Sequence, residues 1–258
     1  MTDPDFIPFG CSTCDRPLDF DLTMAFQPIV DVDAGEVFAY EALARGTSGQ
    51  GVGNLFAQLT DETRYAFDQK CRVRAVELAA KLGIDSRVSI NFMPNAVYEP
   101  KHCIQTTLRA AERTGFPLTS IVFEVTEGER VADRDHLGNI LTEYKKQGFL
   151  TAIDDFGAGY AGLNLLAEFQ PDIIKLDMDL IRSVDADRVR LSIVRGIVGV
   201  CADLGMKVIA EGIETEAEFV ALYRLGIRLM QGYLIAKPAL EALPPVSFAQ
   251  LEKIKSAA

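Results

Sequence analysis

A chain of 258 residues, 48% of them hydrophobic and 24% charged, can bury a large core as one α/β domain or as two smaller domains. Its formal net charge of −11 argues against binding to duplex nucleic acid, which would require a basic face. An acidic chain can still hold an anionic ligand where metal ions and a few placed Arg or Lys residues reverse the local field. No apolar run reaches the length of a membrane span, and residues 1–5 lack the basic start of a signal peptide, so we expect a cytoplasmic protein with no membrane partner.

The first 22 residues are expected to form an irregular extension, because they contain three prolines and show neither a helical nor a strand period. Cys11 and Cys14 in this stretch have the spacing of half a zinc site or of a redox pair. The other cysteines and both histidines lie far away in the sequence, so we expect neither function for this pair. The odd total of five cysteines argues against a disulfide framework.

Two strands are predicted to follow at 24–32 and 36–44, and the short Asp33–Gly35 turn between them makes an antiparallel hairpin. After a loop at 46–53, we expect a short helix near 54–59 and a long helix at about 61–82. From there strands and helices alternate. The expected strands are 88–93, 121–126, 150–154, 172–177, 207–211 and 229–234, and the expected helices are 103–114, 133–147, 161–168, 187–204 and 215–225.

This alternation predicts the fold class. Strands separated by helices pair in parallel with right-handed crossovers, and eight strands can close a barrel filled by its own side chains. We therefore predict an α/β fold of the (β/α)8 TIM-like barrel type over residues 23–245, with an antiparallel first strand, followed by a helix or tail at 246–258. A doubly wound open sheet is the alternative, but no Gly-x-Gly-x-x-Gly turn follows an early strand.

Two adjacent carboxylates, Asp154 and Asp155, end the expected strand at 150–154, and a glycine-rich turn follows them. Like charges at the mouth of a buried strand repel each other unless cations lie between them, which favours Mg²⁺ or Mn²⁺ because these ions prefer carboxylate oxygen. Successive side chains point to opposite faces, so the two cannot point the same way while the strand stays regular. The alternative is that one Asp caps the next helix and the other is solvated.

Polar residues also stand near the ends of other expected strands, and active sites of such barrels lie at the C-terminal ends of the strands. The full set is Glu41, Asn91, Glu124, Asp154, Asp155, Lys175, Glu211 and Gln231. Each residue alone has the alternative of a helix cap or a solvated loop residue. Together they would place five carboxylates around one lysine, which barrel stability does not require. The set therefore predicts a divalent metal centre with two ions bridged by a shared carboxylate.

Lys175 stands between apolar neighbours that should bury its stem, while a rim of acids surrounds its ammonium group. Burial lowers the pKa of an amine and carboxylates raise it, and at an open rim we expect the acids to outweigh partial burial. A protonated Lys175 would donate hydrogen bonds rather than act as a nucleophile. The alternative is a barrel aldolase that uses Lys175 as a Schiff base, and the crowd of metal-type carboxylates argues against it.

The polar residues belong to seven short motifs. These are Glu41-Ala42-Leu43-Ala44-Arg45, Asn91-Phe92-Met93-Pro94-Asn95, Glu124-Val125-Thr126-Glu127, Asp154-Asp155-Phe156-Gly157-Ala158-Gly159-Tyr160, Ile174-Lys175-Leu176-Asp177, Glu211-Gly212-Ile213-Glu214-Thr215 and Gln231-Gly232-Tyr233-Leu234. In this order they resemble the EAL domains, the phosphodiesterases of cyclic di-GMP, over roughly residues 24–240. Departures at Ala161-Gly162 and Ala236-Lys237 lie outside the expected ligands.

The resemblance implies a role for each matching residue. The ligands of the first metal ion would be Glu41, Asn91, Glu124 and Asp154, and those of the second would be Asp154 and Asp155. In catalysis, Lys175 would orient the attacking water, Glu211 would support that water and the metal cluster, and Glu127 would steady the loop after the fifth strand. In substrate binding, Arg45 would contact a phosphate, and the nucleotide pocket would be lined by Gln27, Leu43, Gln231 and Pro238.

The activity that this resemblance implies is hydrolysis of one phosphodiester bond of cyclic di-GMP to linear pGpG, dependent on two Mg²⁺ or Mn²⁺ ions. The alternative is a catalytically inactive EAL domain that acts as a cyclic di-GMP sensor or as a protein-interaction module. Every ligand position is filled, which favours the enzyme. The resemblance also implies a homodimer, formed through the loop after the fifth strand and the neighbouring helices.

Overall fold

The computed structural model describes residues 17–60, 62–97, 99–126, 134–158 and 162–256. Its strands are β1 (Leu22–Asp31), β2 (Glu36–Gly46), β3 (Arg87–Phe92), β4 (Ile121–Thr126), β5 (Leu150–Phe156), β6 (Ile173–Leu176), β7 (Lys207–Ala210), β8 (Leu229–Met230) and β9 (Ala239–Leu240). Its α-helices are α1 (Val52–Phe56), α2 (Arg64–Lys81), α3 (Pro100–Cys103), α4 (Gln105–Thr114), α5 (Arg134–Lys146), α6 (Gly162–Glu168), α7 (Met178–Ile181), α8 (Arg188–Asp203), α9 (Glu216–Arg224) and α10 (Phe248–Lys255).

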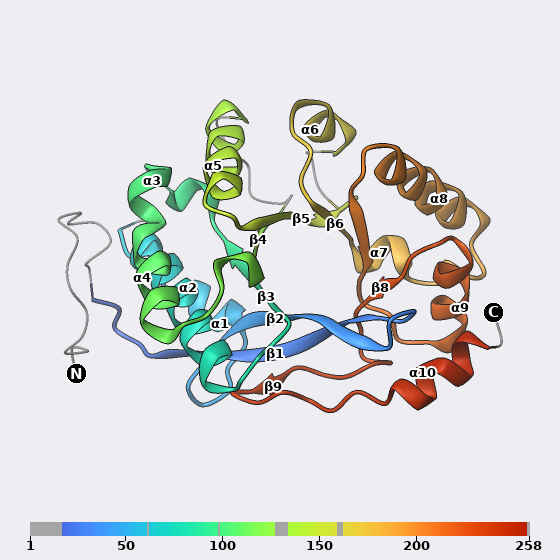
Figure 1. Ribbon diagram of the computed structural model, residues 1–258, viewed down its shortest axis with the longest axis horizontal. Coiled ribbons are helices and arrows are strands. Elements are labelled where there is room, and N and C mark those ends of the chain that lie inside the picture. The colour runs from blue at the N-terminus through green and yellow to red at the C-terminus, as the bar shows by residue number, and fades with distance from the viewer. Residues whose placement is uncertain (1–16, 61, 98, 127–133, 159–161, 257–258) are drawn as a thin grey trace.

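Eight of these strands close a barrel in the order β2-β3-β4-β5-β6-β7-β8-β1 (Figure 1). Neighbours from β2 to β8 pair in parallel, whereas β1 pairs antiparallel with both β2 and β8. A different part of β1 also pairs with the short strand β9. The prediction of a TIM-like barrel with an antiparallel first strand is therefore confirmed.

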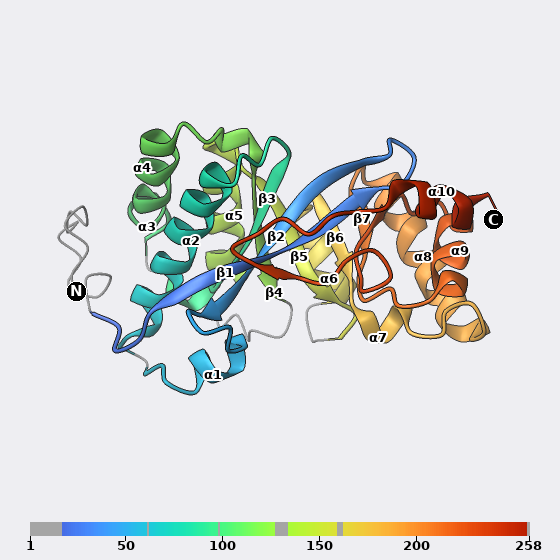
Figure 2. The ribbon, with the colours of Figure 1, turned by 90° about the horizontal axis from the view of Figure 1, so that it is seen from below.

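Helices cover the outside of the barrel. Figure 2 shows α2, α4 and α5 on one side and α8 and α9 on the other. A large apolar cluster fills the space between the helices and the strands, and Phe219 and Leu222 of α9 are fully buried in it. Burial of one such side chain stabilises the fold by roughly 1.5–3 kcal/mol, so the amphipathic helices hold the barrel closed.

The interior of the barrel contains a separate apolar layer. It consists of Ile29, Phe38, Ala39, Val122, Ala152, Ile173, Ile209 and Leu229. Side chains two positions apart on a strand face the same side, so the next inward position of each parallel strand lies one layer closer to its C-terminal end. Two residues after Val122, Ala152 and Ile173, those positions are Glu124, Asp154 and Lys175. Inside the barrel, a polar layer therefore lies next to the apolar layer, on the side of the C-terminal strand ends.

The predicted strand at 229–234 is too long, because β8 ends at Met230. Beyond that point the backbone turns against the segment after β7: Ile213 N donates to Gln231 O at 3.1 Å, and Leu234 N donates to Ile213 O at 3.0 Å. A Cβ atom at Gly232 would lie 2.1 Å from Ile213 O, so only glycine permits this approach. The short helices α3 and α7 and the strand β9 are also absent from the sequence prediction.

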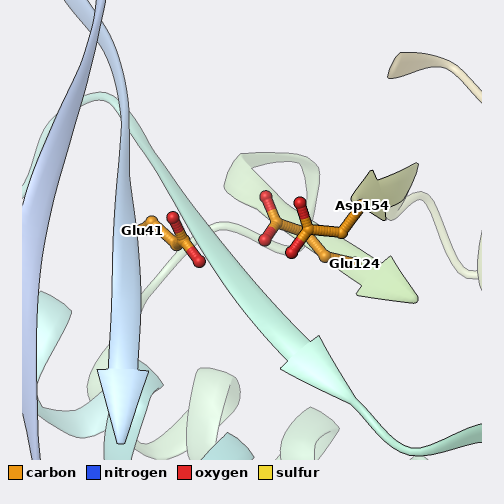
Figure 3. Close-up of side chains that lie close together, drawn as sticks. All are labelled: Glu41, Glu124 and Asp154. Carbon is orange, nitrogen blue, oxygen red and sulfur yellow. The ribbon is translucent and has the colours of Figure 1, made fainter. Parts of the chain in front are cut away.

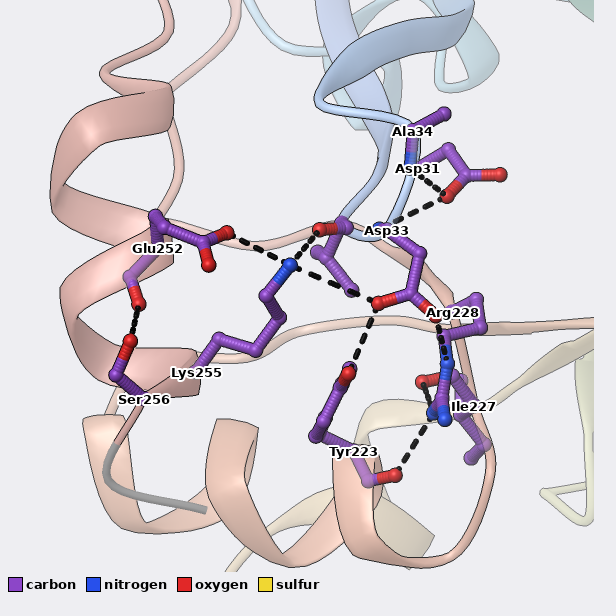
Figure 4. A network of polar contacts seen from close by, with 10 residues as sticks. Asp31, Asp33, Ala34, Tyr223, Ile227, Arg228, Glu252, Lys255 and Ser256 are labelled. Carbon is purple, nitrogen blue, oxygen red and sulfur yellow. Dashed lines mark hydrogen bonds and ion pairs between the residues drawn. The ribbon is translucent and has the colours of Figure 1, made fainter.

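The C-terminal helix α10 is fastened to the end of the barrel opposite the C-terminal strand ends. In the turn between β1 and β2, the Asp33 carboxylate accepts hydrogen bonds from Tyr223 Oη at 2.9 Å and from Arg228 Nε at 2.5 Å (Figure 4). Lys255 of α10 donates to Val32 O at 3.1 Å and lies 3.7 Å from the same carboxylate. These contacts join α10 to the turn between β1 and β2. The division of the chain into an extension, a barrel domain and a C-terminal helix or tail stays a prediction.

No helix within the described ranges has both the length and the apolar character needed to cross a membrane. Cys11 and Cys14 lie outside the described residues. Cys71, Cys103 and Cys201 are buried in the fold.

Candidate active site

Lys175 is the centre of the polar layer at the C-terminal ends of the strands. Its side chain is fully buried, and its Nζ atom lies 2.7 Å from Glu211 Oε1, 2.8 Å from Glu124 Oε2, 3.0 Å from Asp154 Oδ1 and 3.5 Å from Glu41 Oε2. The four acids come from β2, β4, β5 and the residue after β7. The barrel thus brings together residues that are up to 170 positions apart in the sequence (211 − 41).

Uncharged side chains orient two of these carboxylates. Asn91 Nδ2 donates to Glu41 Oε1 at 3.0 Å, and Gln231 Nε2 donates to Glu41 Oε2 at 2.8 Å. The Ser89 hydroxyl donates to Glu124 Oε1. Ser89 was not among the predicted site residues, although its place two positions before Asn91 on β3 is the signal that could have found it.

Two groups of carboxylates have oxygens close enough to share a metal ion. One group is Glu41, Glu124 and Asp154, and the other is Asp154, Asp155 and Glu211; within each group the ligand atoms lie within 4.8 Å of one another. Figure 3 shows the three side chains of the first group converging from three strands. Asp154 belongs to both groups, as a bridging ligand would. Oxygen donors of this kind suit Mg²⁺ and Mn²⁺, and like charges so close together need cations between them.

Asp155 reaches the same end of the barrel because β5 is irregular there. The pairing of β5 with β6 shifts between Ile153 and Phe156, and Asp155 has a φ of +53°. A left-handed conformation in a residue other than glycine costs roughly 1–3 kcal/mol. The Asp155 amide donates to Asp154 Oδ1 at 3.0 Å, which helps to hold this bulge. The strand therefore does not stay regular, and this irregularity places both carboxylates in one site.

Burial, together with the crowding of charge, shifts the pKa values of the acids of the site in the metal-free protein. Burial and the neighbouring carboxylates of Glu41 and Asp154 raise the pKa of Glu124 to about 8, against the lowering effect of Lys175. Burial raises the pKa of Asp155 to about 6, together with the charges of Asp154 and Asp177. Burial likewise raises the pKa of Glu211 well above its usual range.

Lys175 shows the opposite balance. Its burial alone would lower its pKa, but the carboxylates of Asp154, Glu124, Glu211 and Glu41 outweigh burial and hold the pKa well above its usual range. The expectation that the acids outweigh burial agrees with this direction. The expectation of partial burial at an open rim was wrong, because the Lys175 side chain is almost completely buried.

We expect the metal-free protein to lose stability as the pH rises from about 4.5 to about 8. Over this window the folded state holds a proton on Glu124 that the unfolded chain has released, because the pKa of Glu124 is raised from 4.5 to about 8. Melting temperatures measured in a chelator across this range should therefore fall with pH. Glu124→Gln cannot ionise and should weaken the dependence; a melting temperature that rises with pH in the parent protein would contradict this expectation.

The predicted substrate-binding residues lie on β1, on β2, directly after β8 (Gln231) and directly before β9. Gln27 is the antiparallel partner of Glu41, and its Nε2 donates to Ala236 O at 3.1 Å. Arg45 is partly exposed near the end of β2, where its Nη1 donates to Ala44 O at 2.8 Å. Leu43 and Pro238 are partly buried. Glu127 lies outside the described residues.

Asp177 is a further acidic residue near the site that the sequence analysis left without a role. It is buried after β6, its carboxylate accepts from Asp179 N at 2.8 Å at the start of α7, and its charge contributes to the raised pKa of Asp155. Its place two residues after Lys175 is the signal that could have identified it.

Solved structures resemble this fold closely. A standalone versatile EAL protein from Vibrio cholerae O395, in its c-di-GMP bound form, superposes with a TM-score of 0.88 and 53% identity over 90% of this chain and 99% of that chain. BlrP1 from Klebsiella pneumoniae, in a manganese/cy-diGMP complex, has a TM-score of 0.82 and 35% identity over 88% of this chain and 59% of that chain.

Curated proteins with similar sequences include an antirepressor and a cyclic di-GMP phosphodiesterase. The antirepressor BluF of Escherichia coli K12, regulated by blue light and temperature, is 32% identical over 87% of this chain and 56% of its own length. The cyclic di-GMP phosphodiesterase PA2567 of Pseudomonas aeruginosa is 29% identical over 84% of this chain and 38% of its own length. The chain thus spans about half or less of these curated relatives. The family model for the EAL domain matches residues 18–238, and the chain therefore belongs to the EAL-domain family.

Proposed function

We propose that this protein hydrolyses one phosphodiester bond of cyclic di-GMP to linear pGpG, with two Mg²⁺ or Mn²⁺ ions. The observation that carries this proposal is the pair of carboxylate groups that share Asp154 beside the buried Lys175. Relatives named as cyclic di-GMP phosphodiesterases, and a structural neighbour that holds manganese and the dinucleotide, support the same activity.

The residues of this chain have distinct parts in the proposed reaction. When bound, the ions would supply positive charge that neutralises a phosphodiester, activates water and stabilises the leaving oxygen. Glu41, Glu124 and Asp154 would hold one ion, and Asp154 with Asp155 would hold the other. Asn91 donates to Glu41 through its amide nitrogen, which leaves its amide oxygen as a further ligand of the first ion.

Lys175 and Glu211 would orient the attacking water. Their 2.7 Å contact holds a charged donor and an acceptor side by side at the shared carboxylate Asp154. Such a pair can orient a water molecule through one donated and one accepted hydrogen bond. Glu127 keeps its proposed part in steadying the loop after β5.

A second candidate is an EAL domain that binds cyclic di-GMP without cleaving it, or that binds a protein partner. The relative named as an antirepressor favours this candidate. The complete set of acids around Lys175 favours hydrolysis, because a binding module does not require two overlapping carboxylate groups. The set also argues against the aldolase alternative, since the raised pKa of Lys175 keeps its amine protonated.

Turnover of cyclic di-GMP by the purified protein tests the proposal. We expect pGpG to form in Mg²⁺ or Mn²⁺ and its formation to stop in excess chelator. Calorimetry with cyclic di-GMP in the chelator would identify a binding module, which retains affinity but forms no product in either metal. Product formation at an equal rate in the chelator would overturn the dependence on metal ions.

Arg45→Ala should raise the KM for cyclic di-GMP by about tenfold and leave kcat within a factor of a few, as expected for the loss of a partly solvated phosphate contact. The partial exposure of Arg45 leaves its guanidinium accessible to a ligand at the strand ends. Arg113→Ala is a matched control, because Arg113 lies in the last turn of α4, which leads to the N-terminal end of β4, and pairs with Glu77. An unchanged KM in Arg45→Ala would show that Arg45 has only a structural part.

We further propose a homodimer formed by the loop after β5 and the neighbouring helices. Large apolar side chains are exposed on α6 and α8, the helices that follow β5 and β6: Leu163, Val189 and Ile193 are 59%, 68% and 46% exposed. Ile193→Glu should therefore dissociate the dimer, which sedimentation equilibrium measures. The control is Arg113→Ala, which should leave the dimer intact. Val73→Glu on α2 is not a suitable control, because Val73 packs against the core. A monomeric parent protein would refute this proposal.

A further inference from the structure

We propose that Glu218 is a positioning residue for the proposed hydrolysis: its carboxylate ties the segment after β6 to the segment after β7 and thereby fixes Glu211 against Lys175. Glu218 is on the first turn of α9 and is only 2% exposed. This inference rests on the proposed function, because it gives Glu211 and Lys175 their catalytic roles.

The Glu218 carboxylate accepts hydrogen bonds from two different segments. Its Oε2 atom accepts from Glu214 N and Thr215 N, each at 3.1 Å, at the end of the segment that carries Glu211. Its Oε1 atom accepts from Ser183 N at 3.0 Å and lies 3.4 Å from Arg182 Nη1, both after α7. Each carboxylate oxygen thus accepts hydrogen bonds from one of the two segments, so a single carboxylate bridges them.

The Glu218 carboxylate accepts more hydrogen bonds than the cap of α9 requires. The capping box of α9 requires only that Thr215 Oγ1 accept from Glu218 N, at 3.1 Å, and that Glu218 accept from Thr215 N. The bonds from Ser183 N and Arg182 are additional. Ser183 has a φ of +57°, a conformation disfavoured in residues other than glycine, and its amide is aimed at Glu218.

The two bridged segments carry the two catalytic partners. The segment with Ser183 follows β6 through α7, and β6 carries Lys175; the segment with Glu214 follows β7 directly from Glu211. They are also in direct contact, because a Cβ atom at Gly212 would lie 2.4 Å from Met178 Cβ. Glu211 N donates to Leu176 O at 3.3 Å at the strand ends.

The distance between Lys175 Nζ and Glu211 Oε1, 2.7 Å, therefore depends on two segments that could separate beyond the strand ends. A misplacement of about 1 Å in a catalytic constellation can reduce the rate by on the order of a hundredfold. Support from a buried, fully hydrogen-bonded side chain is the means by which such positions are held. Glu218 has this character, and it does not touch the proposed metal or substrate groups.

Glu218→Gln tests the inference. Glutamine keeps the shape but replaces one acceptor oxygen by an NH₂ group, so it cannot accept from both segments. We expect kcat to fall by at least tenfold, while KM and the affinity for cyclic di-GMP in chelator stay within twofold. Thr215→Val is the matched control: it removes the hydroxyl that caps α9 and keeps the bridging carboxylate, so its kcat should stay within twofold of the parent value.

Hydrogen exchange gives a readout that does not depend on activity. In Glu218→Gln, the amides of 182–184 and 211–215 should both exchange faster, whereas Thr215→Val should affect only the start of α9. Glu218→Asp, which keeps the charge but is too short to reach both segments, should reproduce the loss if the Gln variant does not fold. Lys145→Ala, at the other end of the barrel beside Asp172, controls for loss of a surface ion pair.

The results separate the two proposals. A parent protein without turnover would refute the proposed function, and the exchange data alone would then decide whether Glu218 joins the two segments. Parent-like exchange at 182–184 in the Gln variant would overturn the inference. So would a kcat loss in Thr215→Val as large as that in Glu218→Gln, because the helix cap rather than the bridge would then be responsible.

Discussion

Asp154→Asn should abolish turnover of cyclic di-GMP, with a loss in kcat of about a thousandfold, the upper end of the range for removing one electrostatic contact from an active site. Asp154 is the one residue common to both carboxylate groups, so its replacement weakens both proposed ion sites at once. Asparagine keeps the shape of the side chain and can still accept the hydrogen bond from Asp155 N. The variant should therefore fold and still bind cyclic di-GMP.

Two measurements separate loss of the bridge from loss of the fold. Titration with Mn²⁺, followed by the paramagnetic resonance of the free ion, should give fewer bound ions in Asp154→Asn than in the parent protein. Asp172→Asn is the matched control, because Asp172 binds Thr151 N at 2.8 Å at the opposite end of β5. Turnover by Asp154→Asn within tenfold of the parent value would refute the two-ion assignment.

Lys175→Ala is expected to have the second-largest effect: kcat should fall by about a hundredfold or more, while binding of cyclic di-GMP persists. Lys175 is buried and its Nζ atom lies within 3.5 Å of four carboxylates, so its removal leaves those charges without their shared cation. Removing one partner of a buried ion pair costs roughly 3–5 kcal/mol of stability. The metal-free variant should therefore melt well below the parent protein.

The same residue separates phosphodiester hydrolysis from aldolase chemistry. A Schiff base requires a neutral amine, and the surrounding acids hold the pKa of Lys175 well above its usual range. Borohydride should therefore trap no adduct between Lys175 and carbonyl compounds. Lys175→Met, which replaces the stem without the charge, serves if the Ala variant does not fold. A stable trapped adduct, or full turnover by either variant, would overturn the assignment.

The sequence by itself was sufficient to predict the barrel and the lysine and carboxylates of the polar layer, although it missed Ser89. Alternating strands and helices require parallel pairing, and the three-residue turn at Asp33–Gly35 requires an antiparallel first pair, so local pattern alone leads to the observed topology. Parallel strands bring their C-terminal ends together, which is why Glu41, Glu124 and Lys175 could be grouped without coordinates.

Only the tertiary structure decided how these residues face one another. Asp155 joins Asp154 because β5 bulges, and a strand pattern with period two contains no signal for a positive φ at an aspartate. Lys175 is almost completely buried among carboxylates from other strands, and this burial results from long-range packing that its neighbours in sequence do not predict. The sequence analysis did not single out Glu218. In the structure Glu218 belongs to the capping box of α9, and the approach of Ser183 from the segment after α7 makes its carboxylate a bridge between two segments. Local pattern determines which face each side chain takes, whereas distances between strands are set by the closure of the barrel.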